Sequence, residues 1–227
     1  APIEILPALR RLPYDPVKDF TPVARIGEVI AGFAVHPSLG VKNMKEFVAL
    51  IKANPGKYSY ASSGTGGIGH LQTELFKSLS GTFIAHIPYR GAGPALNDTV
   101  AGQVPIIFDN MPSAMPFIRD GRLIPIVVAA PQRLAALPDV PTFKEAGVPE
   151  FDLASWTVML APKGTPPDIV AFLKKETLAA LDDPKLSEAL AKQGVERSAN
   201  QDVRAFLAAE HRQFGHVVRE LGLVETP

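Results

Sequence analysis

A run of glycines and small hydroxyl residues, Ser62 to Gly67, is the stretch whose residue types best suit ligand chemistry. A β-prone segment, Lys57 to Ala61, precedes it, and His70 to Ser80 has the apolar spacing of a helix. A glycine-rich turn that ends a strand and opens a helix directs several backbone N–H groups at one point. The helix dipole adds positive potential there. The stretch therefore predicts a site that binds a small carboxylate and does no chemistry on it.

Two more turns of this kind follow predicted strands. Tyr89 to Pro94 follows a strand at Phe83 to Pro88, and Asp109 follows a strand at Val104 to Phe108. Three strand–turn–helix units in succession predict a largely parallel sheet, at whose carboxyl edge ligands collect. We expect no catalytic residue, no cofactor and no metal. The candidate ligand-binding residues are Ser62, Ser63, Gly64, Thr65, Gly66, Gly67, His70, Tyr89, Arg90, Gly91, Ala92, Gly93, Pro94 and Asp109.

The segment Gly64 to Gly69 also fits the Gly-x-Gly-x-x-Gly pattern of dinucleotide-binding turns. That pattern needs an acidic residue roughly 20 positions further on, at the end of the next strand. Arg90 stands there instead, where it could face a 2′-phosphate. A nucleotide-dependent enzyme is therefore the alternative function, and a turn that serves only tight packing is a third interpretation.

The polar side chains of the first loop have two interpretations each. His70 could donate to a bound carboxylate, or it could be hydrogen-bonded within its own loop. Ser62, Ser63 and Asp109 would suggest a hydrolase with His70, but the chain has no Gly-x-Ser-x-Gly elbow. The other histidines, His36, His86, His211 and His216, show no metal-ligand spacing.

Composition narrows the function classes further. The 227 residues are 46% hydrophobic and 20% charged, which is enough for one large domain or two small lobes with a core. Lys plus Arg and Asp plus Glu both number 23, so no basic surplus points to nucleic acid. The chain has no cysteine and no apolar run of the roughly 20 residues that would cross a bilayer. We therefore expect no direct membrane insertion.

The remaining elements are predicted from hydrophobic spacing. Val23 to Val35 reads as one long strand or two consecutive strands, and Asn43 is a candidate N-cap with Glu46 in capping-box spacing. We expect a short helix around Ala8–Leu12 and another near Thr142–Ala146. After a strand at Trp156 to Leu160 the pattern is purely helical, and helices are expected to begin at Pro166 after a Thr165 cap, at Asp183-Pro184 and at Asn200.

Several sequence blocks together resemble the Bug/TctC family of extracytoplasmic solute receptors, the substrate-binding proteins of tripartite tricarboxylate transporters. The resemblance covers nearly the whole chain. The blocks are Leu12 to Val23, His36-Pro37-Ser38, Ala53 to Lys57, the glycine loop, Pro88 to Gly91, Phe108-Asp109-Asn110, Leu137 to Thr142 and Leu160 to Pro166.

The resemblance implies a periplasmic α/β receptor with the two-lobed Venus-flytrap architecture of type II periplasmic binding proteins. It implies small carboxylate ligands (mono- or dicarboxylates or aromatic acids) and membrane transporter components as partners. Carried over, lobe 1 is 1–29 with 151–227, and lobe 2 is 30–150 with the glycine-rich loops. The sequence departs from the family twice. It starts later, without the signal peptide and first ligand loop, and it has Gly67 where the family usually has Thr or Ser. If the first lobe is incomplete, its apolar surface is exposed. A further alternative is therefore an interaction module that binds another protein through this exposed first-lobe surface.

Overall fold

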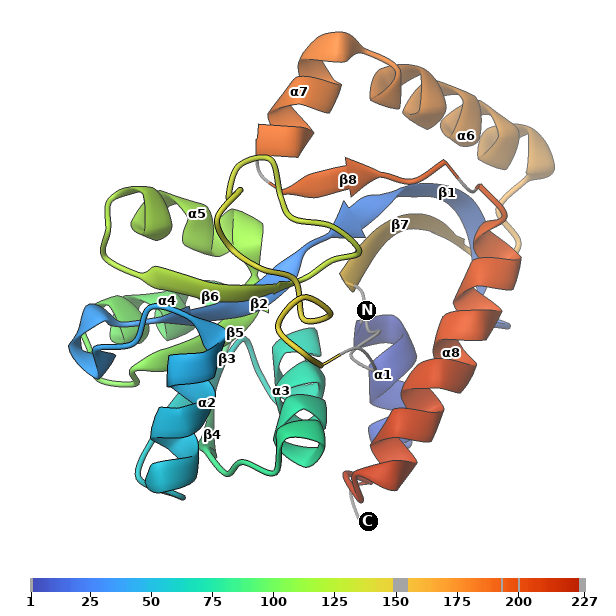
Figure 1. The fold of residues 1–227 in the computed structure, drawn as a ribbon. Helices are drawn as coiled ribbons and strands as arrows, with labels where there is room; N and C mark the ends of the chain where they lie inside the picture. The colour runs from blue at the N-terminus through green and yellow to red at the C-terminus, as the bar shows by residue number, and fades with distance from the viewer. Residues whose placement is uncertain (1, 149–154, 193, 200, 225–227) are drawn as a thin grey trace. The chain divides into compact units, whose positions relative to one another are not determined.

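The computed structural model describes residues 2–148, 155–192, 194–199 and 201–224. It divides into two compact units (Figure 1). Unit 1 comprises Ala1–Val29 and Trp156–Pro227, and unit 2 comprises Ile30–Ser155. Each unit has its own sheet, with strand order β7-β1-β8 in unit 1 and β4-β3-β5-β2-β6 in unit 2. The assignment of these units as the two lobes of a clamp stays a prediction, and its expected boundary at 150/151 lies outside the described residues.

The elements of unit 2 are β2 (Ala31–Val35), the 3-10 turn η1 (Pro37–Leu39), α2 (Met44–Ala53), β3 (Ser59–Ser62), α3 (Ile68–Ser80), β4 (Ala85–Pro88), α4 (Ala92–Val100), β5 (Ile106–Asn110), α5 (Met111–Arg119) and β6 (Ile124–Ala129). The elements of unit 1 are α1 (Pro2–Leu9), β1 (Phe20–Val29), β7 (Ser155–Pro162), α6 (Pro167–Leu181), α7 (Pro184–Lys192), β8 (Val195–Arg197) and α8 (Val203–Glu220).

The sheet of unit 2 is mixed. β3 pairs in parallel with β4 and β5, whereas β2 pairs antiparallel with both β5 and β6. The three strand–turn–helix units are therefore present as predicted, and β3, β4 and β5 end at one edge of the sheet. β2 runs between β5 and β6 in the opposite direction. Gly32 permits this close pairing, because a Cβ there would lie 2.3 Å from the Val127 carbonyl oxygen.

Alternation along the strands gives the sheet of unit 2 two apolar faces. On one face the rings of Phe33 and Phe108 pack edge to face with centroids 4.5 Å apart, under α2 and α3. On the other face Ala34 and Ile107 pack under α4 and α5. The small residues on this second face bring the two helices close to the sheet. Burial on both faces fixes the register of the strands, because a one-residue slip would exchange the faces.

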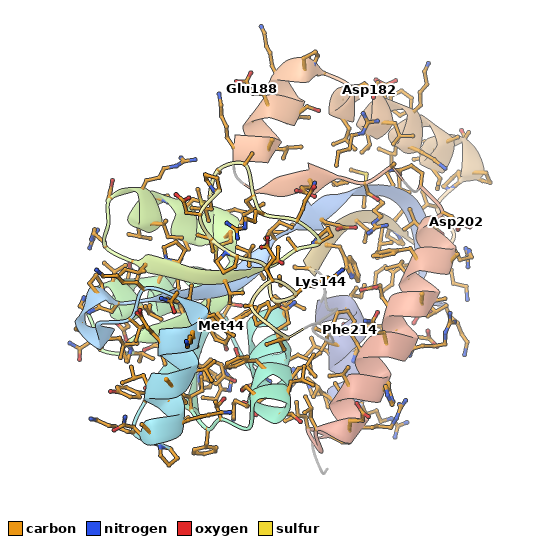
Figure 2. All side chains as sticks on the ribbon, in the orientation of Figure 1. Met44, Lys144, Asp182, Glu188, Asp202 and Phe214 are labelled. Atoms are coloured by element: carbon orange, nitrogen blue, oxygen red, sulfur yellow. The ribbon has the colours of Figure 1, made fainter. Side chains whose placement is uncertain are left out.

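The helix α2 begins with the predicted capping interaction. The Asn43 side chain accepts from the Glu46 backbone N–H at 3.0 Å, and the Glu46 carboxylate accepts from the Lys42 backbone N–H at 2.8 Å. Met44 begins the helix (Figure 2). The Asn43 side chain therefore satisfies the Glu46 amide, one of the first-turn donors of α2.

In unit 1, α8 packs against α1 and β1, and α6 packs against β1. Asp202 caps α8 by accepting from the Ala205 backbone N–H at 3.1 Å, and Phe214 is fully buried further along the same helix (Figure 2). Trp156 on β7 donates its ring N–H to the Glu210 carboxylate at 2.6 Å. None of the described helices is long and apolar enough to cross a membrane.

Several local predictions were wrong. The N-terminal helix is Pro2–Leu9 rather than Ala8–Leu12, and the segment near Thr142–Ala146 makes a single turn closed by the bond from Ala146 N–H to Thr142 O. The Thr165 hydroxyl donates to the Pro162 carbonyl and does not cap α6.

The C-terminal region is not purely helical, because Val195–Arg197 forms β8, antiparallel to β1. Of the two alternatives for Val23 to Val35, the structure has the two consecutive strands, β1 and β2, with Ile30 between them. The start expected at Asn200 lies outside the described residues.

Candidate functional site

The helix α3 begins with amide groups that the chain leaves free. Its N-cap is Gly67, which has no side chain to accept from the first turn. In the described part of the chain, no acceptor is present for the backbone N–H groups of Ile68, Gly69 and His70. These donors lie at the positive end of a 13-residue helix. A Ser or Thr at the N-cap would offer these amides its own oxygen, so Gly67 leaves them available to an anion.

The helix α4 opens beside it in the same way. β3 and β4 are parallel neighbours, and their following loops are joined by a bond from the Gly91 N–H to the Ser63 carbonyl at 3.1 Å. Gly91 is the N-cap with φ +109°, which only glycine adopts readily. Within the described residues, the N–H groups of Ala92 and Gly93 also have no acceptor. Two helix N-termini with unused donors therefore lie at one edge of the sheet.

The third turn is different. The first amide of α5, that of Met111, donates to the Ile30 carbonyl at 2.7 Å, and Pro112 has no N–H. What this turn offers is the side chain of Asp109, which is 3% exposed. One oxygen accepts from the Asn110 N–H at 2.8 Å, and the other, Oδ2, is buried without a partner in the described structure. Burial raises the pKa of the Asp109 carboxyl to about 6, against the opposing effect of the Asn110 bond.

Two histidine side chains form hydrogen bonds with the first glycine loop and with Ser62, which precedes it. His70 Nδ1 accepts from the Gly66 N–H at 3.3 Å. His86 Nε2 lies 2.6 Å from the Ser62 hydroxyl, and that oxygen also accepts from the Gly64 N–H at 3.3 Å. The two imidazole rings stack on each other, with centroids 4.3 Å apart and planes 14° apart. For His70, the interpretation of a hydrogen bond within its own loop therefore describes the structure.

The stack continues on the other side of His86 with the ring of Tyr60, at 4.8 Å. The Tyr60 hydroxyl donates to the Glu74 carboxylate at 2.9 Å, and Glu74 is paired with Lys77 at 2.7 Å. Burial lowers the pKa of His70, and burial together with the neighbouring His70 lowers the pKa of His86 to about 4. Both rings are therefore neutral near pH 7.

The other candidate residues have separate roles in these loops. The Tyr89 hydroxyl donates to Asp98 of α4 at 2.7 Å, so it supports the second turn rather than pointing freely outward. Arg90, Gly93, Pro94 and Thr65 are exposed. The Ser62 hydroxyl is fully buried and bonded within the loop, which leaves no route for it to attack a substrate.

His86 is the residue that the sequence prediction missed. It was considered only for metal-ligand spacing, whereas its partner is Ser62, 24 positions away. The parallel register pairs Tyr60 with His86 and Ser62 with Pro88, which brings the ring and the hydroxyl together. Parallel pairing of two predicted strands, each followed by a glycine turn, was the signal that could have indicated it.

A hollow of about 640 Å³ also lies in unit 2, between the start of α2, the end of α3 and the segment 141–148. None of the candidate residues lines it. The helix N-terminus beside it, that of α2, is capped by the Asn43 side chain, which accepts from the Glu46 N–H at 3.0 Å.

Solved structures with the same fold are periplasmic binding proteins. A structure described as that of a periplasmic transporter matches with 43% identity and a TM-score of 0.94, over 98% of this chain and 75% of that chain. An R. palustris protein solved with adipate matches with 34% identity and a TM-score of 0.92, over 97% of this chain and 75% of that one. MatC from Rhodopseudomonas palustris with bound malate matches with 32% identity and a TM-score of 0.85, over 93% and 74%. The fold is thus that of a solute-binding protein.

The family model described as the tripartite tricarboxylate transporter family receptor matches residues 1–223, and the chain belongs to this family. Protein BugT of Bordetella pertussis is 35% identical over 225 residues, which are 98% of this chain and 69% of BugT. A protein of Pseudomonas sp. strain P51 is 34% identical over 186 residues, which are 82% of this chain and 55% of that protein. The chain thus spans about half to three quarters of these relatives. The family consists of receptors, and the chain is accordingly not an enzyme.

Proposed function

We propose that this chain works in the periplasm, where it captures a small carboxylate at the N-termini of α3 and α4. It then presents the ligand to the membrane components of a tripartite tricarboxylate transporter. The observation that carries this proposal is the set of unused N–H groups at Ile68, Gly69, His70, Ala92 and Gly93. These donors lie on two helices that follow adjacent parallel strands.

The chemistry of these donors favours a carboxylate over a neutral ligand. A hydrogen bond from a backbone amide to a charged oxygen contributes about 1.5–3 kcal/mol, roughly twice a neutral bond. Each helix terminus adds up to about 2 kcal/mol for an anion in a partly buried position. The chain has a formal net charge of zero, so attraction must come from these local groups. The adipate and malate of the solved relatives belong to the same ligand class.

Isothermal titration calorimetry with adipate and with malate tests the proposal. The diamide of adipic acid is the control ligand, because it has the same length without the charge. We expect at least one dicarboxylate to bind and the diamide not to bind. Absence of binding by every carboxylate in a panel of mono-, di- and aromatic acids would overturn the proposal.

The contribution of a single donor is tested by Ala92→Pro. Proline is well tolerated at the first position of a helix, and it removes one N–H group. Loss of one charge-assisted bond predicts about 10-fold or more weaker binding. The matched control is Ala92→Ser, which keeps the N–H group and should bind within about 3-fold of the wild type. Equal affinity of both variants would place the ligand elsewhere.

The transporter step needs a separate experiment. Proteoliposomes that contain the membrane components should accumulate labelled ligand only when this chain is added. Accumulation at the same rate without the chain would contradict a receptor role.

A further inference from the structure

We propose that His70 and His86 are positioning residues, which hold the glycine loop in its ligand-binding geometry through their neutral tautomers. The inference rests on the proposed function, because it concerns the loop that presents the α3 amides to the carboxylate. The imidazole rings of the two histidines are given no contact with the ligand, which the His70 backbone N–H meets in the proposed function. They act through Gly66 and Ser62.

The two rings form hydrogen bonds at the two ends of the loop, His86 at its start and His70 near its end. Ser62 ends β3 immediately before the loop, and its hydroxyl links the His86 ring to the Gly64 amide. Gly66 lies near the end of the loop and donates to His70, which is in the first turn of α3. Gly64 and Gly66 have positive φ angles of 139° and 74°. Glycine adopts positive and negative φ about equally readily, so the glycine backbone alone does not fix these angles. The loop shape is therefore maintained by these side-chain bonds and by two backbone bonds, from Gly67 N–H to Gly64 O within the loop and from Gly91 N–H to Ser63 O across the two loops.

The bond to Gly66 is possible only when His70 is neutral. An imidazole nitrogen accepts a hydrogen bond only if it carries no proton, so Nδ1 must be bare and the proton must lie on Nε2. Protonation of His70 would set an N–H group against the Gly66 N–H group. Gly66 would then rotate away, and the amides of Ile68 and Gly69 two and three positions later would lose their alignment.

The His86 ring is constrained in the same sense. The 2.6 Å separation from the Ser62 oxygen fits a serine hydroxyl that donates to a bare Nε2 while its oxygen accepts from Gly64. Protonation of Nε2 would reverse this bond, so that the ring donates to the Ser62 oxygen. The hydroxyl hydrogen would then turn to its other acceptor, the Gly64 carbonyl at 3.3 Å, and the contacts of the loop would change. Because the ring centroids are 4.3 Å apart, a charge on one ring also disfavours a charge on the other.

Charged and titratable groups of α3 and β3 surround the stack. α3 contributes Glu74 and Lys77, which neutralise each other at 2.7 Å, and β3 contributes Tyr60, whose hydroxyl is bound to Glu74. Glu74 favours protonation of both histidines, while Lys77 and burial oppose it. Burial is the largest of these effects for both rings. The stack therefore stays neutral through the neutral pH range and changes state only under acidic conditions.

The experiment compares variants that keep or remove the acceptor at residue 70. His70→Asn places an amide oxygen near the position of Nδ1, and this oxygen accepts a hydrogen bond at every pH. His70→Phe keeps the ring and its stacking but has no acceptor. His216→Asn, on the exposed surface of α8, is the matched control. The dissociation constants for adipate and malate are measured between about pH 7.5 and pH 4.

At pH 7.5 we expect His70→Phe to bind about 10-fold or more weakly, and His70→Asn to bind within about 3-fold of the wild type. On acidification, the wild type and the His216 variant should lose affinity more steeply than His70→Asn. Titration of the ligand itself is common to all variants, so it cancels when the dissociation constant of each variant is divided by that of the wild type at the same pH. Identical pH profiles of the wild type and His70→Asn, or equal binding by His70→Phe, would overturn the inference.

A second measurement does not depend on ligand binding. The amide ¹⁵N and ¹H resonances of Gly66 in the ligand-free protein should follow the titration of the His70 ring, and this dependence should be absent in His70→Asn. If no carboxylate binds but Gly66 follows the ring, the proposed function fails and the positioning role of His70 stands. If carboxylates bind but the Gly66 resonance ignores the ring, the positioning role fails alone. This measurement also decides the case if His70→Phe does not fold.

Discussion

Replacing Asp109 by asparagine should stabilise the ligand-free protein at neutral pH. The pKa of the buried carboxyl is raised from 3.8 to about 6, which corresponds to a cost of about 3 kcal/mol for the ionised form above that pH. Asparagine removes the charge and keeps an oxygen that accepts from the Asn110 N–H. Its NH₂ group takes the place of the unpartnered Oδ2 and costs about 1–2 kcal/mol if it too is unpaired. The expected net gain is about 1–2 kcal/mol.

The effect has a defined pH dependence. The folded protein holds its Asp109 proton up to about pH 6, whereas the unfolded chain releases it near 3.8. Between these values the folded state binds more protons, so the wild type loses stability as the pH rises through the window. The asparagine variant has no such loss. Its advantage should be complete above about pH 6 and absent below about pH 4.

Thermal unfolding of the ligand-free proteins, followed by circular dichroism at about pH 7.5 and about pH 4, measures this. For a chain of this length, 1–2 kcal/mol corresponds to a Tm higher by about 2–8 °C at neutral pH. The control is Asp120→Asn at the exposed end of α5, which should change Tm little at either pH. A gain for Asp109→Asn that is equal at both pH values, or a loss at neutral pH, would refute the assignment of Asp109 as a buried, raised-pKa carboxyl.

Four other substitutions have effects that follow from local geometry. Gly69→Ala should lower the free energy of unfolding by about 2 kcal/mol or more in urea unfolding, because its Cβ would lie 2.2 Å from the Phe108 carbonyl oxygen. Gly93 occupies the same position of α4, where an added Cβ would meet nothing within 4 Å. Gly93→Ala should therefore raise the free energy of unfolding by up to about 0.5–1 kcal/mol. A cost at Gly93 equal to that at Gly69 would contradict the packing of α3 on β5. Asn43→Ala should lose about 1 kcal/mol by removing the cap of α2, and no loss would show that the capping bonds are not formed in solution. Phe33→Ala should lose about 3–5 kcal/mol, since the fully buried ring contacts four other phenylalanines; a loss below about 1 kcal/mol would mean that the core of unit 2 collapses around the gap.

The local units of the fold could be predicted because their signals lie within a few neighbouring residues. The Asn43–Glu46 cap, the glycine turn before α3 and the three strand–turn–helix units all belong to this kind. The glycine loops were found for the same reason, since a strand, a glycine-rich turn and a helix follow each other in the sequence. The specific ligand contacts of the candidate residues stay a prediction.

The features that sequence reasoning missed depend on pairing between distant segments. β8 has three residues, too few for a period, and it is a strand because Glu196 pairs with Glu28 of β1. Thr142 was expected to start a helix, but its neighbour Phe143 donates to the Val128 carbonyl of β6, which leaves a single turn. The bond between His86 and Ser62 likewise follows from the parallel register of β3 and β4, which no local pattern encodes.

The position of Trp156 makes it an intrinsic fluorescence probe of unit 1. It is the sole tryptophan of the chain, it is 4% exposed, and its ring lies edge-on to Phe206 in unit 1. Its emission in a denaturant titration will report the loosening of unit 1, whereas circular dichroism averages over both units. Two transitions that fail to coincide would show that the halves melt separately, with no dye or engineered tag required.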